Sequence, residues 1–259
     1  MRLEDHLRER RAAGRKLLVP YLTGGLGAAW LDAVRAVVDA GADAVEIGIP
    51  FSDPVMDGPT IQEASQRALE LGATPAKIVA DAAQLDVDAP LVVMTYDNPV
   101  QRTGEERFAA MLADAGIDGA IVPDLPLDEL DPWATAADAA GVETVLLVAP
   151  TTPEDRLRRI CERSRGFVYG ISLMGVTGER RAVAARAEEV AHRTKAVTDT
   201  PVLLGVGIST PEQAVEAAGY ADGVIVGSAL VRRLLEGGGP LGAGAFVREL
   251  RDALDASDT

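Results

Sequence analysis

The stretch AVEIGIPFSDPVMDGPTIQEA, residues 44–64, is the most informative part of this chain. It opens as an apolar, partly β-branched run that is typical of a buried strand, but Glu46 lies inside that run. The run then breaks into a loop that holds three prolines and two further carboxylates, Asp53 and Asp57. A carboxylate in a buried strand is costly unless it is paired or functional, so the stretch points to a site at the end of a strand.

Similar apolar runs recur along the whole chain, separated by helix-length amphipathic segments. Continuous Val, Ile and Leu runs that alternate with helices are typical of parallel strands covered on both faces. Eight such units in about 250 residues match the size of one closed barrel. The sequence therefore predicts an α/β fold, a single (β/α)8 TIM barrel domain over residues 1–259 with an extra N-terminal helix. The eight runs are LLVPYLTG (17–24), AVEIGIP (44–50), LVVMTY (91–96), GAIVPDL (119–125), ETVLLVAP (143–150), FVYGIS (167–172), PVLLGVGI (201–208) and GVIVGSAL (223–230).

An open, doubly wound sheet would have the same alternation of strands and helices. The barrel is favoured because Pro, Asp, Thr and Gly motifs follow most of the eight runs, and a ring places all of those ends together. Several Ala-rich helices are predicted to end at a glycine before the next run, at Gly41, Gly116, Gly141 and Gly219. Two long loops, residues 51–60 and 175–186, are candidates for lids or partner contacts.

The composition excludes several classes of protein. The chain is 47% hydrophobic with a formal net charge of -15, which disfavours binding to nucleic acid or to an anionic membrane surface. No apolar segment reaches the ~18 residues that a membrane span needs, and the N-terminus has no apolar signal region. Cys161 is the only cysteine, so no disulfide framework or thiol metal cluster is expected. We expect a cytoplasmic protein that holds any phosphate through local amides and helix dipoles.

Carboxylates, or else a tyrosine or a lysine, are the candidate proton-transfer groups. His6 and His192 lie in charged helical segments and are expected to face solvent. Alternation along the strand places Val45 and Ile47 on one face and Glu46 on the other, pointing into the barrel. Burial there would raise the pKa of Glu46 towards neutrality, which suits a general acid or base; an internal ion pair is the alternative.

Asp57 lies in the turn-forming sequence MDGP, where Asp is common for local reasons. However, only a short loop separates it from Glu46, so both carboxylates can reach the mouth of the barrel. Two carboxylates in different environments can divide acid and base roles. A Mg²⁺ site formed by Asp53, Asp57 and Asp124 is an alternative that the spacing leaves open.

Glycine motifs at three strand ends indicate a phosphate site. They are GVTG (175–178), GVGIS (205–209) and GSAL (227–230), and the last opens a helix. Backbone amides after the seventh and eighth strands, together with a helix N-terminus, commonly form the phosphate cradle of this fold. No GxGxxG motif directly follows one of the eight apolar runs, and no P-loop is present, so a dinucleotide cofactor has no support.

The motif VEIGIPFSDPVMDGPTIQ closely resembles the signature of the tryptophan synthase alpha subunit family. MTYDNPV, IVPDLP, MGVTG, GVGISTPEQ and VIVGSAL follow in the order that the resemblance requires, so the likeness covers nearly the whole chain. It implies a (β/α)8 barrel that cleaves indole-3-glycerol phosphate to indole and glyceraldehyde 3-phosphate, without a metal or an organic cofactor. It also implies a partner, a pyridoxal-phosphate beta subunit, in an alpha2beta2 heterotetramer.

Carried over residue by residue, the resemblance implies a role for each matching position. Glu46 would be the acid and base at indole C3 and at the glycerol hydroxyl, and Asp57 would stabilise positive charge on the indole nitrogen. The phosphate would bind at Gly178, Gly207, Gly227 and Ser228, and the indole ring would lie against Tyr21, Met94 and Tyr169. Thr177 would reach Asp57 on loop closure, and Tyr96 and Asp124 would have supporting roles.

Three other functions are compatible with the sequence. LTGGLGAAW after the first run and SLM before GVTG depart from the family pattern, so a stand-alone indole-releasing lyase of secondary metabolism is one alternative. A phosphate-binding barrel that mainly regulates a partner is a second, although both carboxylates are retained. The third is an isomerase that acts on a ribose phosphate.

Overall fold

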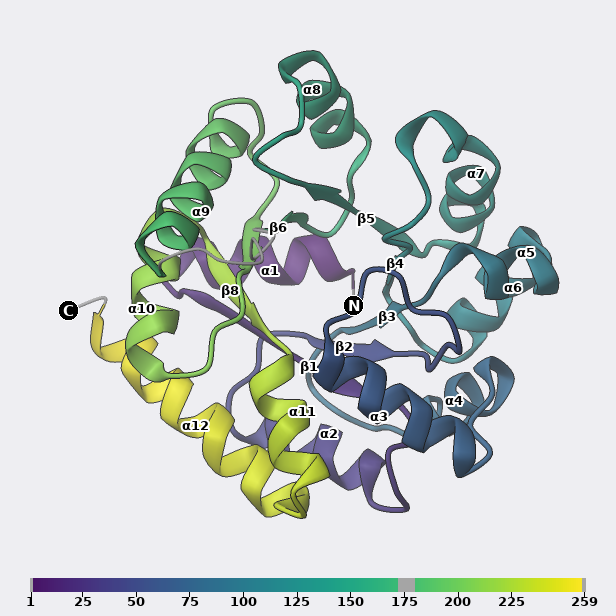
Figure 1. Cartoon of the computed structure of the whole chain (residues 1–259). Helices are drawn as coiled ribbons and strands as arrows, with labels where there is room; N and C mark the ends of the chain where they lie inside the picture. The colour runs from purple at the N-terminus through teal and green to yellow at the C-terminus, as the bar shows by residue number, and fades with distance from the viewer. Residues whose placement is uncertain (1, 172–179, 258–259) are drawn as a thin grey trace.

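Eight parallel strands close into a barrel in the computed structural model, which describes residues 2–171 and 180–257 (Figure 1). Each predicted apolar run contains one of these strands. Strand β1 pairs with β8 as well as with β2, with Leu17 opposite Gly223, so the open-sheet alternative is wrong. The strands are β1 (Leu17–Thr23), β2 (Val45–Gly48), β3 (Leu91–Met94), β4 (Gly119–Ile121), β5 (Glu143–Val148), β6 (Val168–Ile171), β7 (Val202–Gly205) and β8 (Gly223–Val226).

Helices surround the barrel, and Thr-Pro pairs begin two of them. The side chains of Thr74 and Thr210 accept hydrogen bonds from the backbone N–H groups of Lys77 and Gln213, and a proline follows each threonine. The helices are α1 (Leu3–Ala12), α2 (Trp30–Asp39), α3 (Pro59–Glu70), α4 (Pro75–Ala82), α5 (Asp97–Thr103), α6 (Glu105–Asp114), the 3-10 turn η1 (Leu127–Glu129), α7 (Asp131–Ala140), α8 (Glu154–Arg163), α9 (Arg180–Lys195), α10 (Pro211–Tyr220), α11 (Ser228–Leu235) and α12 (Gly239–Ser257).

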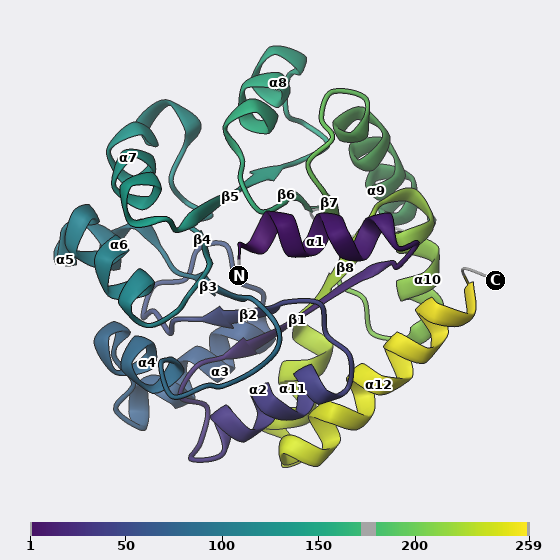
Figure 2. The same cartoon turned by 180° about the vertical axis from the view of Figure 1, so that it is seen from behind.

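The predicted N-terminal helix, α1, closes the end of the barrel where the strands begin (Figure 2). Leu3 and Leu7 are fully buried and pack with the inward-facing side chains of the strands. The backbone N–H of Glu4 donates to Glu143 Oε2 at 2.8 Å, which satisfies one of the unpaired amides at the start of the helix. The opposite end of the barrel, at the carboxyl ends of the strands, is therefore the open one.

The expectation that His6 faces solvent is wrong, whereas His192 is exposed as expected. His6 is only 5% exposed because it lies on the face of α1 that contains Leu3 and Leu7. Burial, with a smaller contribution from the positive charge of Arg10, lowers the pKa of His6.

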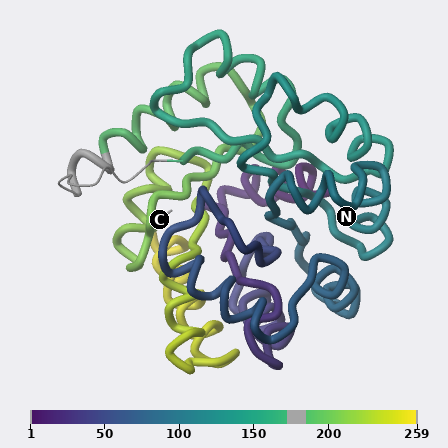
Figure 3. Tube along the Cα trace, turned by 45° about the vertical axis from the view of Figure 1, so that its right-hand side comes forward, coloured from purple at the N-terminus to yellow at the C-terminus, as the bar shows by residue number. Residues whose placement is uncertain are grey.

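The last helix packs against an early one, so segments from the two ends of the sequence lie side by side (Figure 3). Helix α12 contacts α2 extensively. The buried guanidinium of Arg251 on α12 donates to the carbonyl of Lys16 at 2.7 Å and to Asp43 Oδ2 at 3.2 Å. This packing stabilises the β1–β2 side of the barrel, from which Glu46 projects.

The prediction that four helices end at a glycine is confirmed at three positions and wrong at the fourth. Gly41, Gly116 and Gly141 have positive φ and follow helices α2, α6 and α7. Gly219 lies inside α10, which continues to Tyr220.

Within residues 2–171 and 180–257, no helix is both long and apolar enough to cross a lipid bilayer.

Candidate active site

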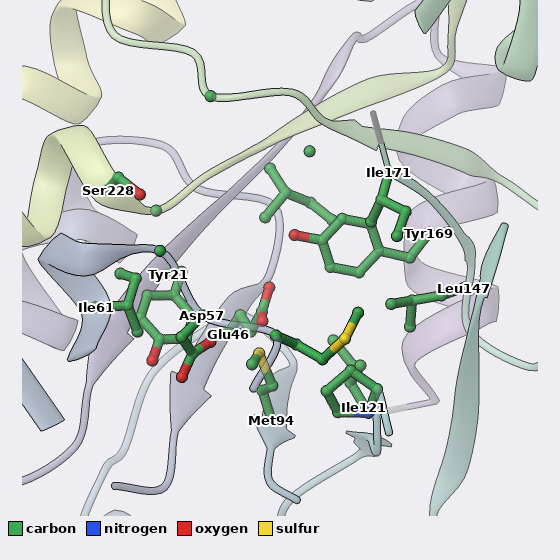
Figure 4. Close-up of a pocket in the computed structure, with 17 residues that line it drawn as sticks. Tyr21, Glu46, Asp57, Ile61, Met94, Ile121, Leu147, Tyr169, Ile171 and Ser228 are labelled. Atoms are coloured by element: carbon green, nitrogen blue, oxygen red, sulfur yellow. The ribbon is translucent and has the colours of Figure 1, made fainter. Parts of the chain in front are cut away.

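A cavity of about 260 Å³ opens at the carboxyl ends of the strands (Figure 4). Its described lining combines two carboxylates, two tyrosines, several aliphatic and methionine side chains, and glycines at strand ends. Because these come from strands and loops around the whole ring, closing the barrel is what brings them together. The lining residues are Tyr21, Glu46, Met56, Asp57, Gly58, Ile61, Met94, Ile121, Pro123, Leu147, Tyr169, Ile171, Gly205, Gly207, Ile225, Gly227 and Ser228.

Glu46 is the most deeply buried polar group of the cavity. As predicted from alternation, Val45 and Ile47 pack between the barrel and its helices while Glu46 points inwards. The side chain is 1% exposed, and Oε2 has no hydrogen-bond partner among the described residues, so the internal ion pair is not formed there. Burial, and then the negative charge of Asp57, raises the pKa of Glu46 to about 8. Glu46 is therefore protonated at neutral pH.

Asp57 lies in the loop between β2 and α3 and lines the same cavity. The Tyr96 hydroxyl donates to its carboxylate and accepts from the backbone N–H of Met56 at 3.1 Å. The Gln62 side-chain amide donates to the Asp57 carbonyl at 2.8 Å. Burial raises the pKa of Asp57 to about 6, although the Tyr96 hydrogen bond acts to lower it. At pH 7 an ionised Asp57 thus shares the cavity with a protonated Glu46.

Tyr96 and Asp124 are not among the residues that line the cavity. The Tyr96 ring stacks on Phe51 with centroids 5.2 Å apart, which orients its hydroxyl towards Asp57. Asp124 accepts a hydrogen bond from the backbone N–H of Asp97 at 2.9 Å, at the start of α5. Both side chains thus stabilise the loops at the mouth.

Two tyrosines flank the Glu46 carboxyl group, and each occupies the space left by a glycine on the next strand (Figure 4). A Cβ on Gly48 would lie 1.9 Å from the Tyr21 hydroxyl, and one on Gly205 would lie 2.5 Å from the Tyr169 ring. Burial raises the pKa of both tyrosines well above the ordinary value. Both therefore remain neutral and present an aromatic surface to the cavity.

We expect Gly48→Ala to lower the free energy of unfolding by about 1–3 kcal/mol, because the new methyl group must displace the Tyr21 ring from a packed position. Denaturant unfolding measures this effect. Gly219→Ala is the matched control, since nothing lies within 4 Å of the added carbon and Ala favours the helix. Equal stabilities for the two variants would show that the Tyr21 packing is not constrained by Gly48.

The predicted phosphate positions within the described residues face the cavity from one side. Gly207, Gly227 and Ser228 all line it. Ser228 is the first residue of α11, so unpaired backbone N–H groups and the positive end of the helix dipole are directed to this side. Gly178 and Thr177 lie outside the described residues.

Met94, Tyr21 and Tyr169 line the cavity as predicted, but sequence reasoning missed most of the apolar wall. Ile121, Leu147 and Ile225 project inwards from β4, β5 and β8. The alternation that identified Glu46 could have found them. Met56 and Ile61 come from the loop after β2 and from α3, where no strand pattern applies.

The alternative Mg²⁺ site is not formed by the described residues, among which no three His, Cys, Asp or Glu side chains lie close enough to hold an ion. Asp53 accepts instead from the Ser52 hydroxyl at 2.6 Å. Asp57 and Asp124 have the separate partners described above.

The fold and the cavity define a (β/α)8 barrel with its site at the carboxyl ends of the strands, the usual place for an active site in this fold. Residues 7–242 match the family model described as Tryptophan synthase alpha chain. The chain belongs to the tryptophan synthase alpha chain family.

Individual relatives agree with the family match over nearly the full length. The tryptophan synthase alpha chain of Streptomyces coelicolor is 48% identical over 238 residues, which cover 90% of this chain and 88% of the relative. The Methanosarcina mazei alpha chain is 49% identical, with 90% and 85% covered. A solved structure of Mycobacterium tuberculosis tryptophan synthase has a TM-score of 0.90 at 42% identity, with 98% of each chain covered. The predicted fold and family are thereby confirmed.

Proposed function

We propose that this chain is a lyase that cleaves indole-3-glycerol phosphate to indole and glyceraldehyde 3-phosphate, with Glu46 and Asp57 as the catalytic residues. Family membership supports the reaction. The observation that carries the proposal is the pair of carboxyl groups held in different protonation states in one cavity, Glu46 with a pKa of about 8 and Asp57 with a pKa of about 6. Such a pair can supply an acid and an anion at the same pH.

In the proposed reaction, protonated Glu46 first transfers its proton to C3 of the indole ring. The ring becomes an indolenine whose nitrogen carries positive charge, and ionised Asp57 stabilises that charge. The Glu46 carboxylate then accepts the proton of the adjacent glycerol hydroxyl. The carbon–carbon bond breaks, its electron pair returns to the ring, and the former alcohol carbon becomes the aldehyde. Glu46 ends the cycle protonated, and each proton transfer contributes about 10²- to 10⁴-fold.

Substrate orientation follows from the two sides of the cavity. The phosphate is proposed to bind at Gly207, Gly227 and Ser228, where amides and the α11 dipole favour an anion. The indole ring is proposed to lie against Tyr21, Met94 and Tyr169. Glu46 lies between Tyr21 and Tyr169, beside the position proposed for the indole ring (Figure 4).

The pH dependence of kcat/KM is expected to be bell-shaped. Activity should rise as pH increases through about 6, because Asp57 must be ionised, and fall above about 8, because Glu46 must be protonated. Steady-state indole formation between pH 5 and pH 9.5 measures both limbs, which belong to the coupled pair. A rate that keeps rising up to pH 9.5 would be incompatible with Glu46 acting first as an acid.

We further propose that the chain works as a cytoplasmic single-domain alpha subunit with a pyridoxal-phosphate beta subunit in an alpha2beta2 assembly. Five of the solved relatives are described as M. tuberculosis tryptophan synthase, which supports a partnership of this kind. Nucleic acid and membranes are not proposed as partners, in keeping with the net charge of -15.

The test is indole release from indole-3-glycerol phosphate by the purified chain, alone and with a beta subunit from the same source. Slow release that rises by orders of magnitude with the partner supports the alpha-subunit role. Fast release by the chain alone would instead identify a stand-alone lyase. No indole under either condition would refute the lyase and leave a regulatory barrel or another barrel chemistry, such as an isomerase.

A further inference from the structure

Helices α3 and α11 begin on neighbouring parts of the cavity rim, and one side chain joins them. Arg232, in the second turn of α11, donates to Thr60 Oγ1 and to Glu63 Oε2, both at 2.9 Å. Side chains on a helix lean towards its N-terminus, so this guanidinium lies on the Ser228 side of its own Cα. Thr60 lies in the first turn of α3 and Glu63 at the start of the second.

The first turn of α3 is in turn connected to the catalytic loop. Thr60 is the second residue of α3 and lies three positions after Asp57. Gln62, in the same turn, donates to the Asp57 carbonyl at 2.8 Å. A displacement of this turn would therefore move the Asp57 backbone, and with it the carboxylate that Tyr96 orients.

Arg232 also carries a positive charge, which the residues that line the cavity do not supply. None of the described residues that line the cavity is Lys or Arg, although a phosphate dianion bound there would share the space with ionised Asp57. Arg232 lies one turn along α11 from the amides of the proposed phosphate site. The Arg232 guanidinium is paired with Glu63, and its hydrogen bond to Thr60 connects α11 to the segment that follows Asp57.

From these contacts we infer that Arg232 is a positioning residue that couples the phosphate site at the start of α11 to the Asp57 loop through Thr60. The inference rests on the proposed function. Phosphate binding on the α11 side is relayed through the Arg232–Thr60 contact and holds α3, and hence Asp57, in the geometry that the ring nitrogen requires. Binding energy from the non-reacting phosphate is thereby used at the reacting end of the substrate.

The most selective test separates the phosphate from the rest of the substrate. The truncated substrate indoleglycerol, which lacks the phosphate, is supplied with and without inorganic phosphite dianion as the missing group. In the wild-type chain, phosphite is expected to stimulate indole release. In Arg232→Gln and in Thr60→Val the stimulation should fall about tenfold, while release from indoleglycerol alone changes little. Arg232→Lys, which keeps the charge, should recover part of it.

Arg35→Gln is the matched control, since Arg35 also makes an exposed ion pair, with Asp32, and donates to the carbonyl of Gln84 far from the cavity. It should behave as wild type. If the wild-type chain is active and phosphite stimulates Arg232→Gln and Thr60→Val as strongly as wild type, the inference is overturned while the proposed function stands. A wild-type chain that releases no indole from indole-3-glycerol phosphate would overturn the proposed function, and the inference with it.

Discussion

Glu46→Gln is expected to lower indole formation from indole-3-glycerol phosphate by about 10⁴-fold, because the amide can neither donate a proton to C3 nor accept one from the hydroxyl. The fold should be unaffected. Glu46 is already neutral at pH 7, since its pKa is raised to about 8, so the amide replaces a neutral group of nearly the same shape. Steady-state assays of indole measure the loss.

Binding of indole-3-propanol phosphate supplies the control for Glu46→Gln. This compound cannot be cleaved, and the variant should bind it within a few-fold of wild type because the phosphate and ring contacts remain. Residual turnover within tenfold of wild type would assign the proton transfers to another group. A variant that lacks turnover but still activates a beta subunit would confirm that catalysis and regulation are separate.

Asp57→Asn should lower kcat by about 10²- to 10³-fold, the usual effect of removing a single group that stabilises charge in a transition state. Asparagine keeps an oxygen that can accept from the Tyr96 hydroxyl, so the loop should hold its place and only the charge is lost. The acidic limb of the pH profile near 6 should disappear with it.

The pH profile of Asp57→Asn distinguishes loss of charge from loss of structure. If the variant retained the limb near pH 6, that limb would belong to a group other than Asp57. If it retained full kcat, the positive charge on the indole nitrogen would need no anion in this site. Circular dichroism and thermal unfolding, expected to match wild type, exclude a simple folding defect.

The barrel could be predicted from the sequence because parallel strands buried on both faces leave continuous apolar runs. The position of Glu46 followed from the same regularity, since alternation requires that Val45 and Ile47 face the helices while their neighbour faces the interior. Asp57 was harder to place. A turn residue has no periodic pattern, and only its separation from Glu46 and the family resemblance suggested that it reaches the mouth.

Other features depend on contacts between distant segments, which no local pattern encodes. Tyr96 was predicted only as a supporting residue, and its hydrogen bond to Asp57 joins the end of β3 to the loop after β2. The contact between Arg232 and Thr60 joins the last βα unit to the second one. His6 was predicted to face solvent because its neighbours in the sequence are charged. Its helical spacing from Leu3 and Leu7 instead places all three side chains against the barrel.

The most direct test of the account is a carbon-13 NMR titration of the side-chain carboxyl groups. The Glu46 and Asp57 signals are assigned by their absence in Glu46→Gln and Asp57→Asn. The account predicts that at pH 7 Glu46 is protonated and Asp57 is mostly ionised, with midpoints near pH 8 and pH 6. A Glu46 signal that titrates near pH 4.5, the ordinary value for glutamate, would contradict the assignment of Glu46 as the initial proton donor.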